Sequence, residues 1–295
     1  MGTVIPAAFE YLRARTADEA FAFLQQHGAD ARVLAGGQSL IPAMRFRLAR
    51  PAVLVDINSL SDLSHLRVDA KSLTIGAIAR DVDVERAPWI TDRRWSLIRD
   101  ASRVVADPVV RQMGTVVGSL CHNDPAGDWT AVALASRAEV IVRGKAGNRR
   151  VTIDDFLVDS YTTAVAEGEM ALAVEFPVPD DRTAGSYQKM ERKVGDFATA
   201  AAAVQVSLNA DGTIRSAGVA LSAAGACAVR VEAAERLLAG QKPTKDLIRA
   251  ASDAAWHRSA PQADLRGSVE FKKHLAGVLV ARGLRQALAR LGGQA

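Results

Sequence analysis

The stretch Val33-Leu34-Ala35-Gly36-Gly37-Gln38-Ser39-Leu40 joins a short apolar run to a segment with helical character. The apolar run over 32–35 is typical of a buried strand, and 52–56 has the same character. Between them, 40–48 is predicted to be helical, so the chain is expected to form a strand–helix–strand unit of the α/β kind here. A further helix is predicted over 17–27, because the capping-box pattern Thr16 to Glu19 precedes it and Gly28 follows.

The pair Gly36-Gly37 can serve either of two purposes. Glycine allows backbone conformations and close approaches that a Cβ atom would prevent, and successive free N–H groups near a helix N-terminus can seat a phosphate. The alternative is a tight turn that requires glycine for its conformation alone. Neither the Rossmann fingerprint nor the P-loop is present. A nucleotide, if bound, would therefore be held by another fold.

A second glycine-containing loop is predicted over 114–119, followed by turns through 121–128. The hydroxyls of Thr115 and Ser119 could donate to a phosphate, and Asp124 or Asp128 could accept hydrogen bonds from ribose or ribityl hydroxyls. The alternative is a loop-and-turn region with capping aspartates. Spacing alone leaves both interpretations open.

The rest of the chain divides near residue 180, where Pro177 and Pro179 bracket Val178 before a polar turn. Before this point we expect a hairpin (66–68 and 73–75), a helix (94–105), a strand pair (139–143 and 150–153) and a strand (170–176). After it we expect three strands (186–192, 199–208 and 214–221) and three helices (231–239, 244–258 and 269–291).

Composition is that of a globular protein of two or three domains: 295 residues, 49% hydrophobic and 24% charged. No stretch reaches the roughly 18 apolar residues of a membrane span. The N-terminus lacks the basic leader and apolar core of a signal peptide, so the cytoplasm is expected. The net charge of +4 is concentrated in 270–295. We interpret these basic residues as a solvated helix face, with cations toward the helix C-terminus, in preference to a binding site for an acidic partner. Nucleic acid is not expected, because no aromatic residues are interleaved with these charges.

Two cysteines, Cys121 and Cys227, are too few for a disulfide framework or for an iron–sulfur cluster, which usually takes four. His122 lies beside Cys121, but adjacent residues ligate one metal poorly, so no metal site is expected and His122 is interpreted as structural. Any redox centre must therefore be a bound organic cofactor or belong to a partner.

Taken together and in this order, the glycine loops and three flanking motifs resemble the FAD-binding medium subunit of the carbon monoxide dehydrogenase and xanthine dehydrogenase (molybdenum hydroxylase) family. The resemblance covers essentially the whole chain. The matching segments are 35–40 (AGGQSL), 106–115 (ADPVVRQMGT), 124–128 (DPAGD) and 186–200 (SYQKMERKVGDFATA), the last being similar to the carbon monoxide dehydrogenase branch.

The resemblance implies an α+β fold: a two-subdomain FAD-binding fold of the vanillyl-alcohol oxidase (PCMH) type, followed by a C-terminal domain of three antiparallel strands and three helices. The implied divisions are 1–60, 61–180 and 181–295. The two glycine loops would hold the FAD pyrophosphate, and Phe197 stands where some relatives place a tyrosine near the isoalloxazine. The implied cofactor-binding residues are Val33, Leu34, Ala35, Gly36, Gly37, Gln38, Ser39, Leu40, Val105, Thr115, Gly118, Ser119, Asp124, Asp128, Leu172, Lys189 and Phe197.

The chain departs from the family pattern Thr-Ile-Gly-Gly at the second loop, where it reads Thr115-Val116-Val117-Gly118. A β-branched residue such as Val117 is strained at positive φ, so either the loop bends differently or FAD is held less tightly. Ala171 and Leu172 are both candidates for the family's flavin-contacting leucine.

The function implied by the resemblance is electron transfer within a complex. A large molybdopterin-binding subunit would oxidise the substrate, and a small iron–sulfur subunit would pass electrons to FAD on this chain. The FAD would then deliver the electrons to an external acceptor. The resemblance implies a dimer of heterotrimers in the cytoplasm, able to associate with the inner membrane face through the complex. No catalytic acid, base or nucleophile is expected on this chain. The alternatives are a self-contained flavin oxidase or dehydrogenase and a non-enzymatic interaction protein.

Overall fold

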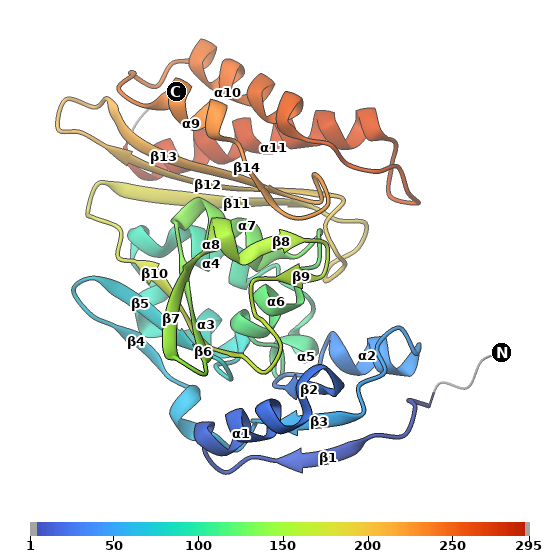
Figure 1. Ribbon diagram of the computed structural model, residues 1–295. Helices are drawn as coiled ribbons and strands as arrows, with labels where there is room; N and C mark the ends of the chain where they lie inside the picture. The colour runs from blue at the N-terminus through green and yellow to red at the C-terminus, as the bar shows by residue number, and fades with distance from the viewer. Residues whose placement is uncertain (1–4, 293–295) are drawn as a thin grey trace.

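The computed structural model describes residues 5–292 and has three stacked sheets, with helices between and outside them, and a small two-stranded sheet of β8 (Leu157–Asp159) and β9 (Thr162–Thr163) (Figure 1). A small parallel sheet lies at the bottom of the view, a five-stranded antiparallel sheet in the middle and a four-stranded antiparallel sheet above it. No helix within 5–292 is long and apolar enough to cross a membrane.

The small sheet has the order β1-β3-β2, with all strands parallel. Its strands are β1 (Glu10–Arg13), β2 (Ala31–Leu34) and β3 (Val53–Asp56), connected through α1 (Ala17–His27) and α2 (Leu40–Arg45). Thr16 caps α1, since its hydroxyl accepts a hydrogen bond from the Glu19 N–H at 3.1 Å. The Gly36-Gly37 loop follows β2 at the carboxyl edge of this parallel sheet. This is the edge at which α/β sheets bind ligands.

The five-stranded sheet has the order β4-β5-β10-β6-β7, and each neighbouring pair is antiparallel. Its strands are β4 (Leu66–Val68), β5 (Ser72–Gly76), β6 (Glu139–Gly144), β7 (Gly147–Thr152) and β10 (Met170–Pro177). The accompanying elements are α3 (Asp81–Arg86), α4 (Ser96–Ser102), α5 (Pro108–Arg111), α6 (Val116–His122), α7 (Asp128–Ser136), α8 (Ile153–Phe156), β8 (Leu157–Asp159) and β9 (Thr162–Thr163). Short 3-10 turns lie at Gly28–Asp30, Ser61–Leu63, Pro88–Thr91 and Arg93–Trp95.

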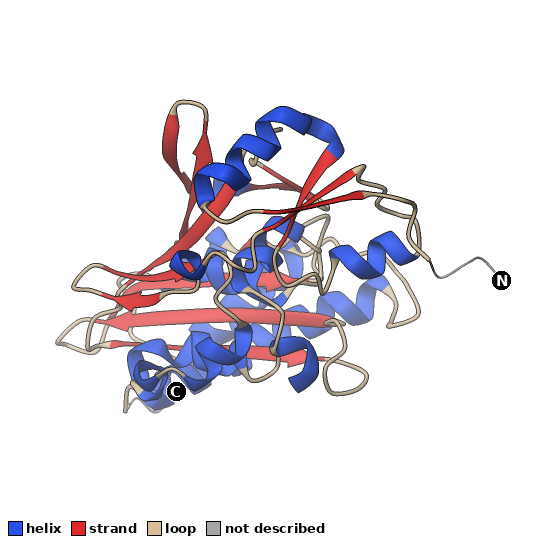
Figure 2. Ribbon diagram, turned by 90° about the horizontal axis from the view of Figure 1, so that it is seen from below, coloured by secondary structure: helices blue, strands red, loops and turns tan. Residues whose placement is uncertain are grey.

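The four-stranded sheet has the order β11-β12-β13-β14, with helices on both faces (Figure 2). Its elements are β11 (Thr183–Met190), β12 (Ala200–Leu208), β13 (Ile214–Ser222), β14 (Val229–Arg230), α9 (Glu232–Leu238), α10 (Lys245–Arg258) and α11 (Val269–Arg290). One face packs on α9 and α11, and the other on α4 and α7. The second contact is close, because a Cβ atom on Gly218 would lie 1.9 Å from the Ala135 carbonyl oxygen.

Most of the predicted elements are confirmed, including the α+β class, the parallel strand–helix–strand unit and the three C-terminal helices. The C-terminal sheet has a fourth, two-residue edge strand, β14, that was not predicted. The helix expected over 40–48 ends at Arg45, because Arg47 adopts φ 57° and the Leu48 N–H closes onto the Ala43 carbonyl. The helix expected over 94–105 is the 3-10 turn at 93–95 followed by the shorter α4.

The loop expected over 114–119 is wrong from Val116 onward, because α6 occupies 116–122, whereas the expected turns are observed over 123–127, before α7 begins at Asp128. Thr115 is the N-cap of α6, with its hydroxyl accepting from the Gly118 N–H at 3.0 Å. Every residue of α7 is buried, so its sequence has no polar face to reveal a helical period.

Candidate functional site

The two glycine segments, far apart in sequence, meet in the structure. A Cβ atom on Gly36 would lie 2.2 Å from the Met113 carbonyl oxygen and 3.1 Å from the Gly114 Cα. Gly37 adopts φ 72°, a left-handed conformation that glycine adopts without strain. The loop after β2 therefore touches the turn before α6, and this contact is possible only with glycine at position 36.

Two polar side chains that sequence reasoning missed, Asn58 and Arg80, connect these segments. The Asn58 Nδ2 donates to the Ala35 carbonyl at 2.9 Å. The Arg80 guanidinium donates to the Met113 carbonyl at 2.8 Å and to the Asn58 Oδ1 at 2.6 Å. The only signal in the sequence was that Asn58 follows the predicted strand over 52–56, at the edge where ligands bind.

Val117 lies inside α6 and is 2% exposed, and it is not among the residues with positive φ. The strain considered for this position therefore does not arise, because helical backbone has negative φ, which a β-branched residue can adopt. The segment turns into a helix at Thr115. Gly118 and Ser119 also lie on α6, which ends at Asn123 in a left-handed conformation.

Asp124 lies in the turn between α6 and α7, where its carboxylate accepts from the Ala126 N–H at 2.8 Å and from the Tyr161 hydroxyl at 3.2 Å. The His122 Nε2 lies 3.9 Å from the same carboxylate. Burial lowers the pKa of His122, although Asp124 opposes this shift.

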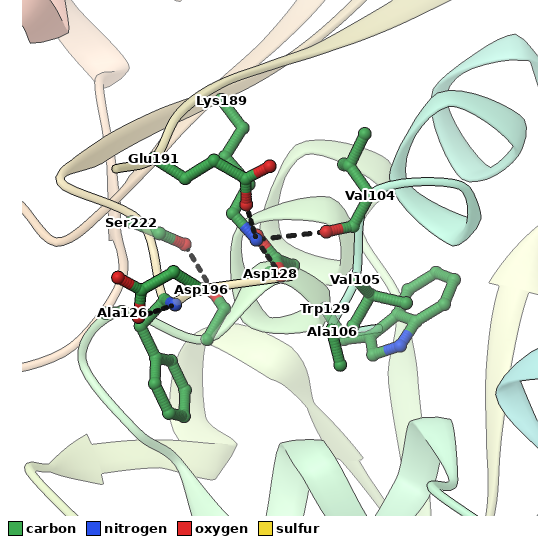
Figure 3. Close-up of polar contacts among 12 residues, drawn as sticks. Val104, Val105, Ala106, Ala126, Asp128, Trp129, Lys189, Glu191, Asp196 and Ser222 are labelled. Carbon is green, nitrogen blue, oxygen red and sulfur yellow. Dashed lines mark hydrogen bonds and ion pairs between the residues drawn. The ribbon is translucent and has the colours of Figure 1, made fainter. Parts of the chain in front are cut away.

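Asp128 and Lys189 form a buried ion pair at the N-terminus of α7 (Figure 3). The Lys189 side chain is 3% exposed, and its Nζ lies 3.0 Å from the Asp128 Oδ2, 3.0 Å from the Val104 carbonyl and 3.3 Å from the Glu191 Oε2. The Tyr187 hydroxyl donates to the other Asp128 oxygen at 2.6 Å. Burial raises the pKa of Asp128, while Lys189 and the hydrogen bonds oppose that shift.

Val105 lies in a segment whose carbonyl groups are held from several directions. Lys189 contacts the Val104 carbonyl, and the buried Arg111 donates to the Val105 and Ala106 carbonyls at 3.1 Å each. Ala106 has φ 49°. The loop after β11 packs against this segment, since a Cβ atom on Gly195 would lie 3.1 Å from the Asp107 nitrogen.

The remaining predicted site residues lie in different surroundings. Phe197 follows this loop and is 48% exposed. Leu172 is half-buried in β10, and its carbonyl accepts from the Ala77 N–H at 2.9 Å. Ser39 precedes α2 as its N-cap without a side-chain cap hydrogen bond, and the Gln38 side chain donates to the Gly36 carbonyl at 3.1 Å.

Asp81, which sequence reasoning also missed, lies directly beneath the second glycine segment. It is 4% exposed, it accepts from the Trp129 indole N–H at 2.9 Å, and its backbone N–H donates to the Gly114 carbonyl at 2.9 Å. A Cβ atom on Gly114 would lie 2.4 Å from the Asp81 Oδ2. Burial raises the pKa of this carboxyl to about 7.

The residues present fit a dinucleotide diphosphate. Two glycine-containing segments meet at the carboxyl edge of a parallel sheet, and the first N–H groups of a helix have no partner within that helix. Arg80 places a half-buried guanidinium against the second segment, and Lys189 places a buried ammonium beside Asp128.

Two family models match the chain: the FAD binding domain in molybdopterin dehydrogenase over residues 7–179, and the CO dehydrogenase flavoprotein C-terminal domain over 185–287. The carbon monoxide dehydrogenase medium chain of Hydrogenophaga pseudoflava is 37% identical over 287 residues, covering 97% of this chain and 99% of the relative. The corresponding medium chain of Afipia carboxidovorans is 35% identical, with 97% and 99% covered.

Solved structures agree with this assignment. Carbon monoxide dehydrogenase from Hydrogenophaga pseudoflava superposes with a TM-score of 0.93 at 38% identity, over 97% of this chain and 99% of that one. Quinoline 2-oxidoreductase from Pseudomonas putida 86 superposes with a TM-score of 0.88 at 28% identity, over 97% and 98%. The chain therefore belongs to the family of FAD-binding medium subunits of molybdopterin dehydrogenases, as an oxidoreductase flavoprotein of the carbon monoxide dehydrogenase and xanthine dehydrogenase type.

Proposed function

We propose that this chain binds FAD between its two glycine segments and transfers electrons from iron–sulfur clusters on a partner chain to an external acceptor. The observation that carries the proposal is the contact of Gly36 with Met113 and Gly114, which forms a single seat from two distant segments. Bound FAD would supply the redox chemistry, and the protein would supply binding and orientation.

The proposed roles of the residues follow from their positions. Segments 33–40 and 115–119 would hold the diphosphate and the adjoining parts of FAD, including Gly118 and Ser119 on the first turn of α6. Asp124, with one carboxylate oxygen shared with Tyr161, would accept from a hydroxyl of the cofactor. Val105, Leu172 and Phe197 would contact the flavin.

Asp128 and Lys189 are proposed to act as a pair. Because the Asp128 carboxylate already accepts from Lys189 and Tyr187, it would chiefly fix the Lys189 ammonium beside the cofactor. The Lys189 ammonium also lies close to the Glu191 carboxylate, so the carboxylates of Asp128 and Glu191 together fix its position. The divisions 1–60, 61–180 and 181–295 remain part of this proposal, with 1–4 and 293–295 outside the described residues.

The proposed partners are a large molybdopterin-binding subunit and a small iron–sulfur subunit, assembled as a dimer of heterotrimers in the cytoplasm. Relatives are named as a medium chain, a complex subunit or an FAD subunit of dehydrogenases, which supports a multi-subunit complex. The chain's own cysteines support external clusters: there are only two, and burial raises the pKa of Cys121 to about 12, so that it stays a thiol.

The test is purification of this chain from its native source, followed by identification of the bound chains and of the cofactor released by heat. We expect FAD, a molybdopterin-containing chain and a cysteine-rich chain. The isolated flavinated subunit should not bleach with substrates of molybdenum hydroxylases. Bleaching of that subunit would instead favour a self-contained oxidase, and a colourless protein that binds no added FAD would contradict the proposal.

A further inference from the structure

Arg80 contacts the second glycine segment directly and is connected to the first through Asn58. Its Nη1 donates to the Met113 carbonyl at 2.8 Å, and its Nη2 donates to the Asn58 Oδ1 at 2.6 Å. The backbone of Arg80 is itself fixed, since it pairs with Thr115 in an antiparallel bridge and its N–H donates to the Asp83 carboxylate at 3.0 Å. Because the Arg80 backbone is fixed, the positions that its guanidinium can reach are restricted.

Asn58 continues this connection into the parallel sheet. Its Nδ2 donates to the Ala35 carbonyl at 2.9 Å and to the Asp56 Oδ1 at 2.6 Å, and its backbone N–H donates to the same Asp56 oxygen at 2.8 Å. Asp56 is held in turn by the Tyr11 hydroxyl on β1. One row of hydrogen bonds thus runs from the parallel sheet through Asn58 and Arg80 to the carbonyl that faces Gly36.

This arrangement has an electrostatic consequence for an anionic ligand. The carbonyl oxygens of Ala35 and Met113 carry partial negative charge and lie where the segments meet. Donors from Asn58 and Arg80 engage both oxygens, which reduces their repulsion of phosphate. The same donors fix the two segments before binding, so less conformational freedom is lost when the ligand binds.

We propose that Arg80 and Asn58 are positioning residues that hold the two glycine segments at the separation needed to bind the FAD diphosphate. The inference rests on the FAD site proposed above and concerns residues that do not belong to either segment. Arg80 acts through the Met113 carbonyl and through Asn58. The guanidinium stays charged although desolvation lowers the pKa of Arg80, because arginine is not deprotonated in proteins.

The test uses the full chain freed of flavin and titrated with FAD, with quenching of flavin fluorescence as the readout. We expect Arg80→Met and Asn58→Ala each to raise the Kd for FAD about tenfold, the loss produced by one or two hydrogen bonds. Because both residues belong to one row of hydrogen bonds, their effects should not multiply. The increase in the Kd for FAD in the double variant should be much smaller than the product of the increases in the two single variants.

Two measurements separate positioning from other roles. Hydrogen exchange of the flavin-free protein should be faster at 35–39 and 113–116 in both variants, which a purely attractive charge on Arg80 would not produce. Arg290→Met is the matched control, because Arg290 is a similarly half-buried arginine that pairs with Asp100 at 2.7 Å. This variant should lose thermal stability while keeping the wild-type Kd for FAD.

The possible outcomes are distinguishable. Suppose that Asn58→Ala keeps the wild-type Kd for FAD, that only Arg80→Met loses affinity, and that this loss disappears at high salt. Arg80 would then act through its charge alone, and the inference would be overturned. Unchanged hydrogen exchange at both segments in the two variants would overturn it as well. Failure of the wild-type chain itself to bind FAD would instead contradict the proposed function.

Discussion

At the scale of single residues, the absence of one Cβ atom at Gly36 decides whether the two segments can meet. Its hypothetical Cβ would overlap a backbone oxygen rather than the end of a flexible side chain, so local rearrangement cannot relieve the contact. Gly37 differs, since its nearest neighbours are side-chain carbons of Ile41 and Leu34 and its requirement for glycine comes from φ 72°. The two glycines thus serve separate purposes.

Replacing Gly36 with alanine should therefore separate the segments and weaken FAD binding by about a hundredfold, equivalent to about 2.8 kcal/mol. The measurement is FAD titration of the flavin-free protein. Gly225→Ala is the control, because its Cβ would have its nearest neighbour at 3.6 Å and should leave binding unchanged. Wild-type affinity in Gly36→Ala would show that the segments do not need to touch.

Asp81 gives a prediction on pH. Because burial raises the pKa of Asp81 to about 7, the folded protein binds this proton more tightly than the unfolded chain, whose aspartates titrate near about 3.9. The stabilisation is full below about pH 4 and is lost as pH rises towards 7, at up to about 1.4 kcal/mol per pH unit, and the loss levels off above 7.

Asp81→Asn keeps the acceptor for the Trp129 indole and removes the titration. The difference in free energy of unfolding between the variant and the wild type, measured by urea denaturation from pH 4 to 8, should shift in favour of the variant with rising pH. A constant difference across that range would show that Asp81 does not titrate there.

The residue scale is also where sequence reasoning reached least far. Asn58 and Arg80 lie 22 residues apart and Arg80 and Met113 lie 33 apart, so no local motif marks them as a unit. Asp81 was missed because an aspartate beside an arginine is typical of a solvated surface, and only the fold buries it. The glycine segments could be identified because they matched a family pattern.

At the scale of elements, α6 converts the second glycine segment into a fixed structure. Thr115 has an extended conformation and its hydroxyl caps the Gly118 N–H, which orients the first turn of the helix. This helix was not predicted because two glycines and a threonine within five residues resemble a loop. By contrast, α1, α10 and α11 were predicted closely, since each follows a threonine or serine cap and has apolar and polar faces.

Thr115→Ala should lower the free energy of unfolding by about 1 kcal/mol, the usual cost of losing a helix cap. It should also weaken FAD binding, because the first turn of α6 adjoins the proposed diphosphate site. Thr244→Ala is a matched control: Thr244 caps α10 in the same way, at 3.2 Å from the Leu247 nitrogen, far along the chain from the glycine segments. We expect similar loss of stability but wild-type FAD affinity in Thr244→Ala, and equal affinities in the two variants would exclude a role for Thr115 in binding.

At the scale of the whole molecule, the C-terminal sheet is packed onto α7 with almost no intervening side-chain volume. Gly218 on β13 lies against the Ala135 carbonyl, and Gly185 on β11 lies against Leu97 of α4. The Lys189–Asp128 ion pair and the Ser222 hydroxyl, which donates to the Gly127 carbonyl at 2.5 Å, bridge the same interface. The sequence predicted the elements on both sides but gave no indication of this close contact.

These contacts predict that the flavin-free protein unfolds in a single calorimetric transition. Gly218→Ala should lower its midpoint by several degrees or split it in two, because the added Cβ would force β13 away from α7. Gly225→Ala should leave the transition unchanged. Two transitions in the wild-type protein would show that the C-terminal part folds independently.

The location of Lys189 has a consequence for anyone who would shorten this gene. The boundary between the two family models lies between 179 and 185, so the FAD-binding portion could be expressed alone as a fragment ending near 179. Such a fragment would end before the lysine, so Asp128 would lose its cation, the Val104 carbonyl would lose its donor, and the face of α7 that packs on the C-terminal sheet would be exposed. The amino-terminal portion would therefore lack the cation that β11, the strand following the boundary, supplies to Asp128.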